Sequence, residues 1–176
     1  QYARAQAMAN DLDGARKSLA RTLELEPNHP GARLALIEVE ARAGRTQKAL
    51  DSARDFQKAF PQAAEGYLIE GDVQMSAKNF PAATAAYRRA LALSKAPQAA
   101  IKVYQSLLAG GQRAEADQFS ALWMKDHPKD VAFRIQVAER MTAAGDFEGA
   151  KRAYLPVLEL QPDNAAALNN LAWACH

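Results

Sequence analysis

The chain has 176 residues, of which 49% are hydrophobic and 24% are charged. This composition is typical of a globular protein with a continuous core, and it excludes an intrinsically disordered chain. Its 22 basic and 20 acidic residues give a formal net charge of +2. A nucleic-acid-binding surface needs a clustered excess of positive charge, so we expect no nucleic-acid partner.

The sequence also argues against a membrane span and against a sheet protein. It has no apolar run of about 18 residues, so we expect no membrane-spanning helix. Alanine is the commonest residue and aromatic residues make up only 7%, which favours closely packed helices. The one cysteine, Cys175, cannot form an intrachain disulfide.

Four prolines recur with a period of 34 residues: Pro27, Pro61, Pro128 and Pro162. The interval from Pro61 to Pro128 is two periods less one residue, and Lys95 stands where the intervening proline would fall. A fixed period of this length indicates a repeat protein. Stacked repeats form extended binding surfaces rather than a single catalytic pocket.

Each period also carries a small residue twelve positions before the proline position, without exception. Two further sets of positions follow it at intervals of four and three residues, so the three sets lie on one face of a helix. The small residue lets a neighbouring helix approach closely, and the larger side chains fill the remaining space. The sets are Ala15, Ala49, Ala83, Ala116 and Ala150; Leu19, Ala53, Tyr87, Ser120 and Tyr154; and Thr22, Phe56, Ala90, Trp123 and Val157.

A turn is predicted seventeen positions before each proline position, where glycine or asparagine prevails. These residues suit the left-handed conformation that ends a helix. A second helix should start just after this turn and run to just before the proline, while the segment before the turn has its own helical pattern. Every period is therefore helix, short turn, helix, longer turn. The turn positions are Asn10, Gly44, Lys78, Gly111 and Gly145.

Two units, "YLIEGDVQMSAKNFPAATAAYRRALALSKAP" and "RIQVAERMTAAGDFEGAKRAYLPVLELQPDN", carry the small, aromatic and proline positions in register. In this pattern the whole chain resembles a tandem tetratricopeptide repeat (TPR) array. The resemblance implies an all-α fold, a right-handed α-solenoid of eleven helices including two partial units. We divide this single domain into repeats at about residues 1–29, 30–63, 64–96, 97–130 and 131–164, with a partial repeat at 165–176. Gly71 is the only glycine at the family's first-helix packing position, where the other units have Ala3, Ile37, Tyr104 and Ala138.

The phase of the repeats suggests a piece cut from a longer array, because residue 1 falls partway along a first helix. The final segment, "DNAAALNNLAWACH", reads as a first helix without a following partner. We expect Leu168, Leu171 and Cys175 to pack on the last complete unit and Trp173 to stay uncovered. Self-association through this uncapped helix is therefore a further expectation.

Two local irregularities should affect the geometry of the repeats. Pro156 falls inside the last full second helix, where it removes a hydrogen bond to the carbonyl of Arg152 and should kink the helix. Gly110–Gly111 lies in the unit whose spacing is one residue short, and it predicts an altered angle between repeats, either a bend or a hinge.

No constellation of residues supports catalysis, a cofactor or a metal. His29, His127 and His176 have no metal-like spacing, and His29 and His127 are expected to be solvent-exposed turn residues. Cys175 has no nearby base at a spacing that would make it a nucleophile. No phosphate-binding glycine loop, zinc motif or serine elbow is present. We therefore predict a protein that is not an enzyme.

The resemblance implies that the first helices line the inner wall of the array and bind a protein or peptide ligand there. At the corresponding positions the sequence repeats apolar, then acidic or amide, then apolar or small residues. The alternative is that the leading Leu and Ile side chains pack against the adjacent helix and leave only a thin polar stripe. The groove candidates are Leu34, Glu38, Arg42, Leu68, Asp72, Met75, Ile101, Gln105, Leu108, Ile135, Glu139, Thr142 and Trp173.

The acidic residues of this stripe predict the charge of the ligand. Family members that clamp a terminal carboxylate use Lys and Asn on these helices, whereas Glu38, Asp72 and Glu139 stand here. A carboxylate clamp is therefore not expected. We expect instead an extended or helical ligand with apolar anchors and positive charge. Charge reversal of these three residues should weaken the binding of such a ligand.

Two more specific functions compete at the level of sequence. The stretch "PDNAAALNNLAWA" resembles bacterial TPR lipoproteins of exopolysaccharide and protein-sorting (PEP-CTERM type) systems, which implies a periplasmic or outer-membrane location. The alternative is the substrate-recognition arm of a larger enzyme such as a glycosyltransferase. A lipoprotein signal or a nucleotide-sugar-binding domain in the flanking sequence would separate the two.

Overall fold

The computed structural model describes residue 7 and residues 11–174, and these residues form helices joined by short connections. No strand occurs among them, which confirms the all-α class of helical repeats. The first predicted helix, over residues 1–9, lies almost entirely outside the described residues, so the labels begin at α2. The helices are α2 (Leu12–Leu25), α3 (Pro30–Arg42), α4 (Thr46–Ala59), α5 (Ala64–Ser76), α6 (Phe80–Ser94), α7 (Pro97–Ala109), α8 (Arg113–Asp126), α9 (Val131–Ala143), α10 (Phe147–Leu160) and α11 (Ala165–Ala174).

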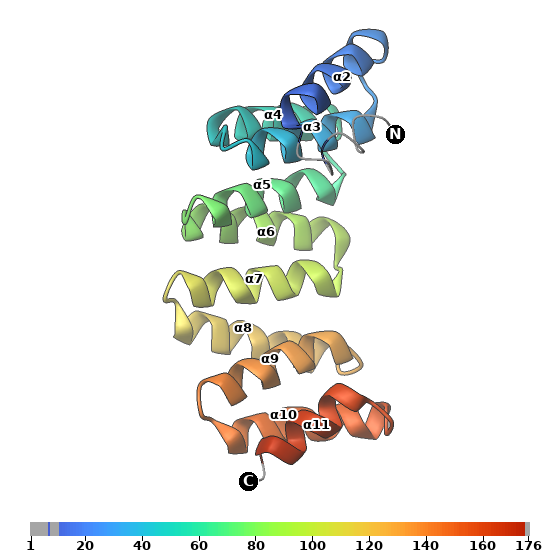
Figure 1. The fold of residues 1–176 in the computed structure, drawn as a ribbon. Helices are drawn as coiled ribbons and strands as arrows, with labels where there is room; N and C mark the ends of the chain where they lie inside the picture. Colours follow the sequence, from blue (N-terminus) through green and yellow to red (C-terminus); the bar gives the residue numbers. More distant parts are fainter. Residues whose placement is uncertain (1–6, 8–10, 175–176) are drawn as a thin grey trace. The chain divides into compact units, whose positions relative to one another are not determined.

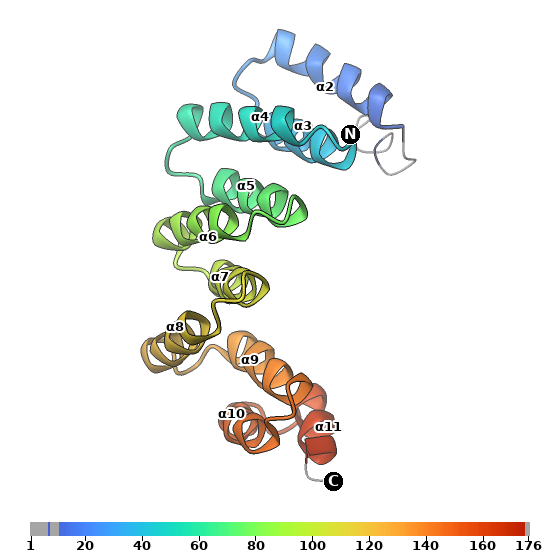
Figure 2. The same cartoon turned by 90° about the vertical axis from the view of Figure 1, so that its left-hand side faces the viewer.

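The chain divides into two compact units, an N-terminal unit of residues Gln1–Lys95 and a C-terminal unit of residues Ala96–His176. In the N-terminal unit, α3 contacts α2, α4 and α5, and α5 packs on α6 (Figure 1). In the C-terminal unit, α9 contacts α7, α8, α10 and α11 (Figure 2). Within each unit, therefore, the first helices of neighbouring repeats lie side by side, as α3 and α5 or α7 and α9 do.

The predicted turns take the predicted backbone conformation. Gly44, Gly111 and Gly145 have φ values of +71°, +75° and +78°, and Lys78 adopts φ +58° at the equivalent position. Asn10, the fifth turn position, lies outside the described residues. A left-handed turn thus ends each of the described first helices of the complete repeats.

The repeat interval that is one residue short contains an unusually short connection, between α6 and α7. Lys95, with φ +50°, caps α6, and only Lys95 and Ala96 separate the two helices, whereas residues 127–130 separate α8 from α9. The backbone at Gly110 (φ −80°, ψ 2°) matches that at Ala77 (φ −80°, ψ 1°) of the preceding repeat, so the altered angle between repeats stays a prediction. The turn at Gly110–Gly111 is therefore regular.

Each described pair of helices is held together by residues whose sizes complement one another. The alanine of the first set is fully buried in every repeat, from Ala15 to Ala150. A large residue on the first helix faces a small one sixteen positions later on the second helix, or the reverse. A Cβ atom added at Gly71, for example, would lie 2.3 Å from Cε1 of Tyr87. The pairs that meet are Ile37 with Ala53, Gly71 with Tyr87, and Ala138 with Tyr154; Tyr104 and Ser120, at the equivalent positions of the remaining repeat, are both buried.

The last helix packs on its neighbours through residues other than those expected. Ala167 is fully buried against α9 and α10, and Leu171 is half-buried in the same cluster. Leu168 is 46% exposed, so the prediction that it packs inward is wrong, because in the helix it lies one position beyond the buried face that Ala167 occupies. Cys175 lies outside the described residues. Trp173 is 62% exposed, and its ring packs at 5.6 Å against that of Phe147.

Pro156 does not interrupt α10, which stays helical from Phe147 to Leu160. In the described part of the chain, no helix is both long enough and apolar enough to cross a membrane.

Candidate functional site

Six of the thirteen groove candidates line two clefts, one in each unit. Leu34, Glu38 and Arg42 line a cleft of about 960 Å³ between α2 and α3, which we call the α2–α3 cleft. Ile101, Gln105 and Ile135 line a cleft of about 400 Å³ between α7 and α9, which we call the α7–α9 cleft. Both volumes fall in the range of about 300–1,000 Å³ that is usual for ligand-binding pockets.

The α2–α3 cleft is lined by aliphatic side chains together with several basic ones. Lys17 and Arg21 enter it from α2, and Arg42 enters from α3, while Glu38 brings the one carboxylate among its described lining residues. Arg21 also donates a hydrogen bond to Glu24 at 2.6 Å. The α2 residues of this cleft lie outside the predicted groove, because that groove comprised first helices alone.

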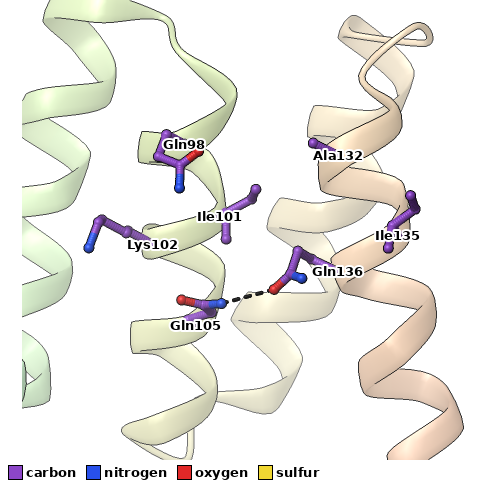
Figure 3. Close-up of a pocket in the computed structure, with 7 residues that line it drawn as sticks. All are labelled: Gln98, Ile101, Lys102, Gln105, Ala132, Ile135 and Gln136. Atoms are coloured by element: carbon purple, nitrogen blue, oxygen red, sulfur yellow. Dashed lines mark hydrogen bonds between the residues drawn. The ribbon is translucent and has the colours of Figure 1, made fainter. Parts of the chain in front are cut away.

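The α7–α9 cleft is lined mainly by amide and aliphatic side chains. Figure 3 shows Gln105 on α7 and Gln136 on α9 pointing toward one another across it. Ile101 is 8% exposed and Ile135 is half-buried, so the aliphatic groups form its inner surface. Four lining residues were not predicted, because they lie one position from the predicted stripe or one turn before it: Gln98, Lys102, Ala132 and Gln136.

A chain of hydrogen bonds joins two glutamines of this cleft to Glu139, which lies outside it. Nε2 of Gln105 donates to Oε1 of Gln136 at 3.0 Å, and Nε2 of Gln136 donates to Oε2 of Glu139 at 3.0 Å. Because an ionised carboxylate only accepts hydrogen bonds, Glu139 fixes which end of the Gln136 amide faces it. The two glutamines are therefore oriented before any ligand arrives.

The remaining groove candidates lie outside these two clefts. Asp72 accepts a 2.6 Å hydrogen bond from the hydroxyl of Tyr87, and Thr142 donates to the carbonyl of Ala138 at 2.9 Å. Glu139 is exposed, and Trp173 contacts Phe147. Leu68, Met75 and Leu108 are half-buried. The leading Leu34 and Ile135 pack partly into the helix cores as well, as the alternative interpretation expected.

Three tyrosines on or beside the first helices titrate above their usual range. Burial raises the pKa of Tyr87, and the hydrogen bond to Asp72 and the charge of Asp72 raise it further. Burial is also the main cause of the raised pKa of Tyr104 and Tyr154. All three phenols are therefore neutral hydrogen-bonding groups at physiological pH.

The two described histidines serve the connections between repeats. Nδ1 of His29 accepts a hydrogen bond from the backbone N–H of Ala32 and so caps α3. His127 is half-buried and stacks on Trp123, with ring centroids 3.7 Å apart, so the expectation that it is exposed is wrong. The stacking follows from their spacing of four residues, which places His127 one helical turn beyond Trp123. His176 lies outside the described residues. Within the described part of the chain, no group of His, Cys, Asp and Glu is arranged to hold a metal ion.

Comparison with known proteins places this geometry in a family. The sequence model of the tetratricopeptide repeat matches residues 2–64, 42–100 and 143–176. Comparison with curated proteins gives no match.

Solved structures of similar fold are distant in sequence. The crystal structure of MamA has a TM-score of 0.68 and 21% identity, over 94% of this chain and 97% of that one. TTC0263, a thermophilic TPR protein in Thermus thermophilus, has a TM-score of 0.63 and 16% identity, over 99% and 95%. YrrB, a TPR protein with an unusual peptide-binding site, has a TM-score of 0.60 and 19% identity, over 96% and 87%.

Proposed function

The chain belongs to the tetratricopeptide repeat family, and from that premise we propose that it is a protein-interaction scaffold that binds segments of other proteins along its first helices. The observation that carries the proposal is the α7–α9 cleft, where exposed Gln105 and half-buried Gln136 stand beside an aliphatic inner surface. Binding sites combine apolar surface with a few placed polar groups in this way.

The charge of the ligand follows from the carboxylates on the first helices. Glu139 is exposed at the end of the hydrogen-bond chain, and Asp72 is held by Tyr87. These groups favour a ligand with apolar anchors and positive charge. Around Glu38, however, Lys17 and Arg42 oppose that preference, and Lys102 opposes it within the α7–α9 cleft. We therefore assign the attraction for positive charge mainly to Glu139 and Asp72.

Selection of peptide ligands tests the proposal directly. A display library of random short peptides is selected on the immobilised chain, and the recovered peptides are synthesised and titrated by fluorescence anisotropy. We expect apolar peptides rich in Lys and Arg, and a loss of affinity of about three- to tenfold in the Glu139→Lys variant. Glu159→Lys is the matched control, because Glu159 is exposed on the second helix α10 and changes the net charge equally. Failure to recover any saturable peptide contradicts the proposal.

Self-association is a second interaction that a specific observation favours. Trp173 on α11 and Phe147 on α10 are 62% and 41% exposed, and their rings pack against each other with centroids 5.6 Å apart. Large apolar side chains that gather on a surface are typical of interaction sites. Light scattering over a range of concentrations tests this proposal: the mass should rise with concentration in the wild type and stay constant in Trp173→Ala. A constant monomer mass in both proteins contradicts it.

Two more specific functions, in an exopolysaccharide or protein-sorting system or in a larger enzyme, are proposed from the sequence. The stretch of residues 162–174 supports a bacterial exopolysaccharide or protein-sorting system, and a lipoprotein signal encoded with it is the test. A nucleotide-sugar-binding domain encoded on the same polypeptide would instead support the recognition arm of a glycosyltransferase.

A further inference from the structure

We propose that the α7–α9 cleft binds the main chain of an extended segment of another protein, read by the side-chain amides of Gln105 and Gln136. The inference rests on the proposed scaffold function and names the chemistry of one of its sites. It assigns the recognition of peptide groups to these two glutamines and the recognition of an aliphatic side chain to Ile101 and Ile135.

The chemistry of the cleft matches a peptide group better than a charged group. Three of its described lining residues are glutamines, and Lys102 is the one that carries a charge. A side-chain amide has one carbonyl acceptor and two N–H donors, the same kinds of group that a peptide unit presents. Amides therefore pair with main chain without the desolvation cost of burying an ion.

The hydrogen-bond chain sets which groups face the ligand. Glu139 draws the amide nitrogen of Gln136 toward itself, so the oxygen of Gln136 faces the nitrogen of Gln105. The oxygen of Gln105 then points away from Gln136, as Figure 3 shows. Each amide nitrogen carries two hydrogens and uses one in this chain. The cleft thus presents the Gln105 oxygen as an acceptor and a second N–H of each glutamine as a donor.

The conformation of the ligand follows from this arrangement. In a helical segment, the peptide N–H and C=O groups already bond to one another, so they are not available to side-chain amides. In an extended segment, successive side chains point to opposite sides and the main-chain groups stay open. An extended segment can therefore place one aliphatic side chain on Ile101 and Ile135 while its peptide groups meet Gln105 and Gln136.

Because the glutamine amides bind main chain and the isoleucines bind an aliphatic side chain, we expect the cleft to be selective among peptides rather than to bind them with high affinity. Gln105 is exposed, so its hydrogen bond to Gln136 competes with water in the free protein. Exchanging that bond for bonds to a peptide changes the number of hydrogen bonds little, and the aliphatic contact drives binding. The amides mainly discriminate against ligands whose main chain cannot bond.

The test uses the peptides recovered by display selection on the chain. Their affinities are measured by fluorescence anisotropy, with blocked ends, against the wild type and a Gln105→Ala/Gln136→Ala variant. We expect about tenfold weaker binding in the double variant for the peptides that occupy this cleft. Gln118→Ala is the matched control, because Gln118 is exposed on the second helix α8, and it should bind as the wild type does.

A second measurement uses the wild-type protein and changes the peptide. Methylating one central backbone nitrogen of such a peptide removes a main-chain donor, and we expect a similar loss of affinity in the wild type but little further loss in the double variant. If every recovered peptide binds the double variant as tightly as the wild type, the inference is overturned while the scaffold function stands. If no peptide is recovered at all, the scaffold function and the inference both fail.

Discussion

The hydroxyl of Tyr87 donates a hydrogen bond to Oδ1 of Asp72 over 2.6 Å, and so joins the second helix α6 to the first helix α5. The two residues meet because Gly71 lets the tyrosine ring lie directly against α5. Tyr87, which packs between the helices, thus holds the carboxylate of Asp72, which is a candidate for ligand binding. Packing and recognition are coupled at this point of the repeat.

Replacing Tyr87 by Phe should lower stability at neutral pH and flatten its decline at high pH. Loss of a hydrogen bond to a half-buried carboxylate should cost about 1–2 kcal/mol in the free energy of unfolding. The pKa of Tyr87 is raised by burial and by Asp72 above its unfolded value of about 10. The stability that this neutral phenol contributes is complete below about pH 10 and is lost as the pH rises above that value.

Urea unfolding at about pH 8 and pH 11 measures both effects. The wild type should lose more of its free energy of unfolding between the two pH values than Tyr87→Phe does, because only the wild type has the phenol of Tyr87. The titration of lysines is common to both proteins and cancels in the comparison. Parallel pH curves would show that Tyr87 does not titrate as inferred.

Replacing Gly71 by Ala should destabilise the chain, although alanine is the better helix former by about 1 kcal/mol. The added Cβ would lie 2.3 Å from Cε1 of Tyr87, and overpacking of this kind costs about 1–3 kcal/mol. Thermal unfolding should therefore show a lower midpoint for Gly71→Ala. In the background of Tyr87→Leu the same substitution should become neutral or stabilising, and a midpoint that rises in the Tyr87 background would contradict the clash.

The sequence predicted the fold well because its signals repeat. The period of the prolines and the buried alanines gave the helix positions, and the glycines gave the turns, as at Gly44 and Gly145. Such signals depend on the local backbone conformation and on the spacing of the residues that share one helix face, and both can be read from the sequence. The complementary sizes of Gly71 and Tyr87 could be recognised only once the contact was known, since each residue alone is a departure from the pattern.

The candidate site was less predictable, because its chemistry depends on contacts between helices. Position in the repeat identified Gln105, but its partner Gln136 lies outside the predicted stripe. Lys17 lies on a second helix and still lines a cleft with Glu38. Asp72 was predicted as a groove charge, yet its hydrogen bond to Tyr87 shows that part of its role is structural.

Replacing Lys78 by Gly should stabilise the chain. Lys78 adopts φ +58° at the turn where three other repeats have glycine, and a left-handed conformation costs a non-glycine residue about 1–2 kcal/mol. Part of this gain is offset because glycine has more freedom in the unfolded chain, so we expect a net gain of about 0.5–1 kcal/mol in urea unfolding. Lys125→Gly, in the last turn of α8, is the matched control and should cost up to about 1 kcal/mol. Equal effects of the two substitutions would contradict the role of the turn.

Arg45 links two repeats of the N-terminal unit through carboxylates in different environments. Its Nε lies 3.0 Å from Oε2 of Glu40, whose side chain is 8% exposed, and its guanidinium nitrogen lies 2.8 Å from Oδ1 of Asp13, whose side chain is 74% exposed. The contact between Arg45 and Glu40 is an ion pair and not a well-aligned hydrogen bond, because the buried Oε2 of Glu40 has no hydrogen-bond donor among the described residues. Loss of Arg45 would therefore leave a buried charge uncompensated.

Arg45→Ala should cost about 2–3 kcal/mol in the free energy of unfolding, because breaking a buried ion pair from one side is strongly destabilising. Asp13→Ala should cost less than about 1 kcal/mol, because the contact of Asp13 with Arg45 is exposed and screened by water. In two other repeats the positions equivalent to Glu40 hold Leu107 and Met141, so Glu40→Leu can fill the same space without a charge. The Arg45→Ala/Glu40→Leu protein should recover most of the lost stability in urea unfolding. If the double variant is no more stable than Arg45→Ala, the cost of Arg45→Ala comes from lost packing of the arginine stem rather than from the unpaired carboxylate.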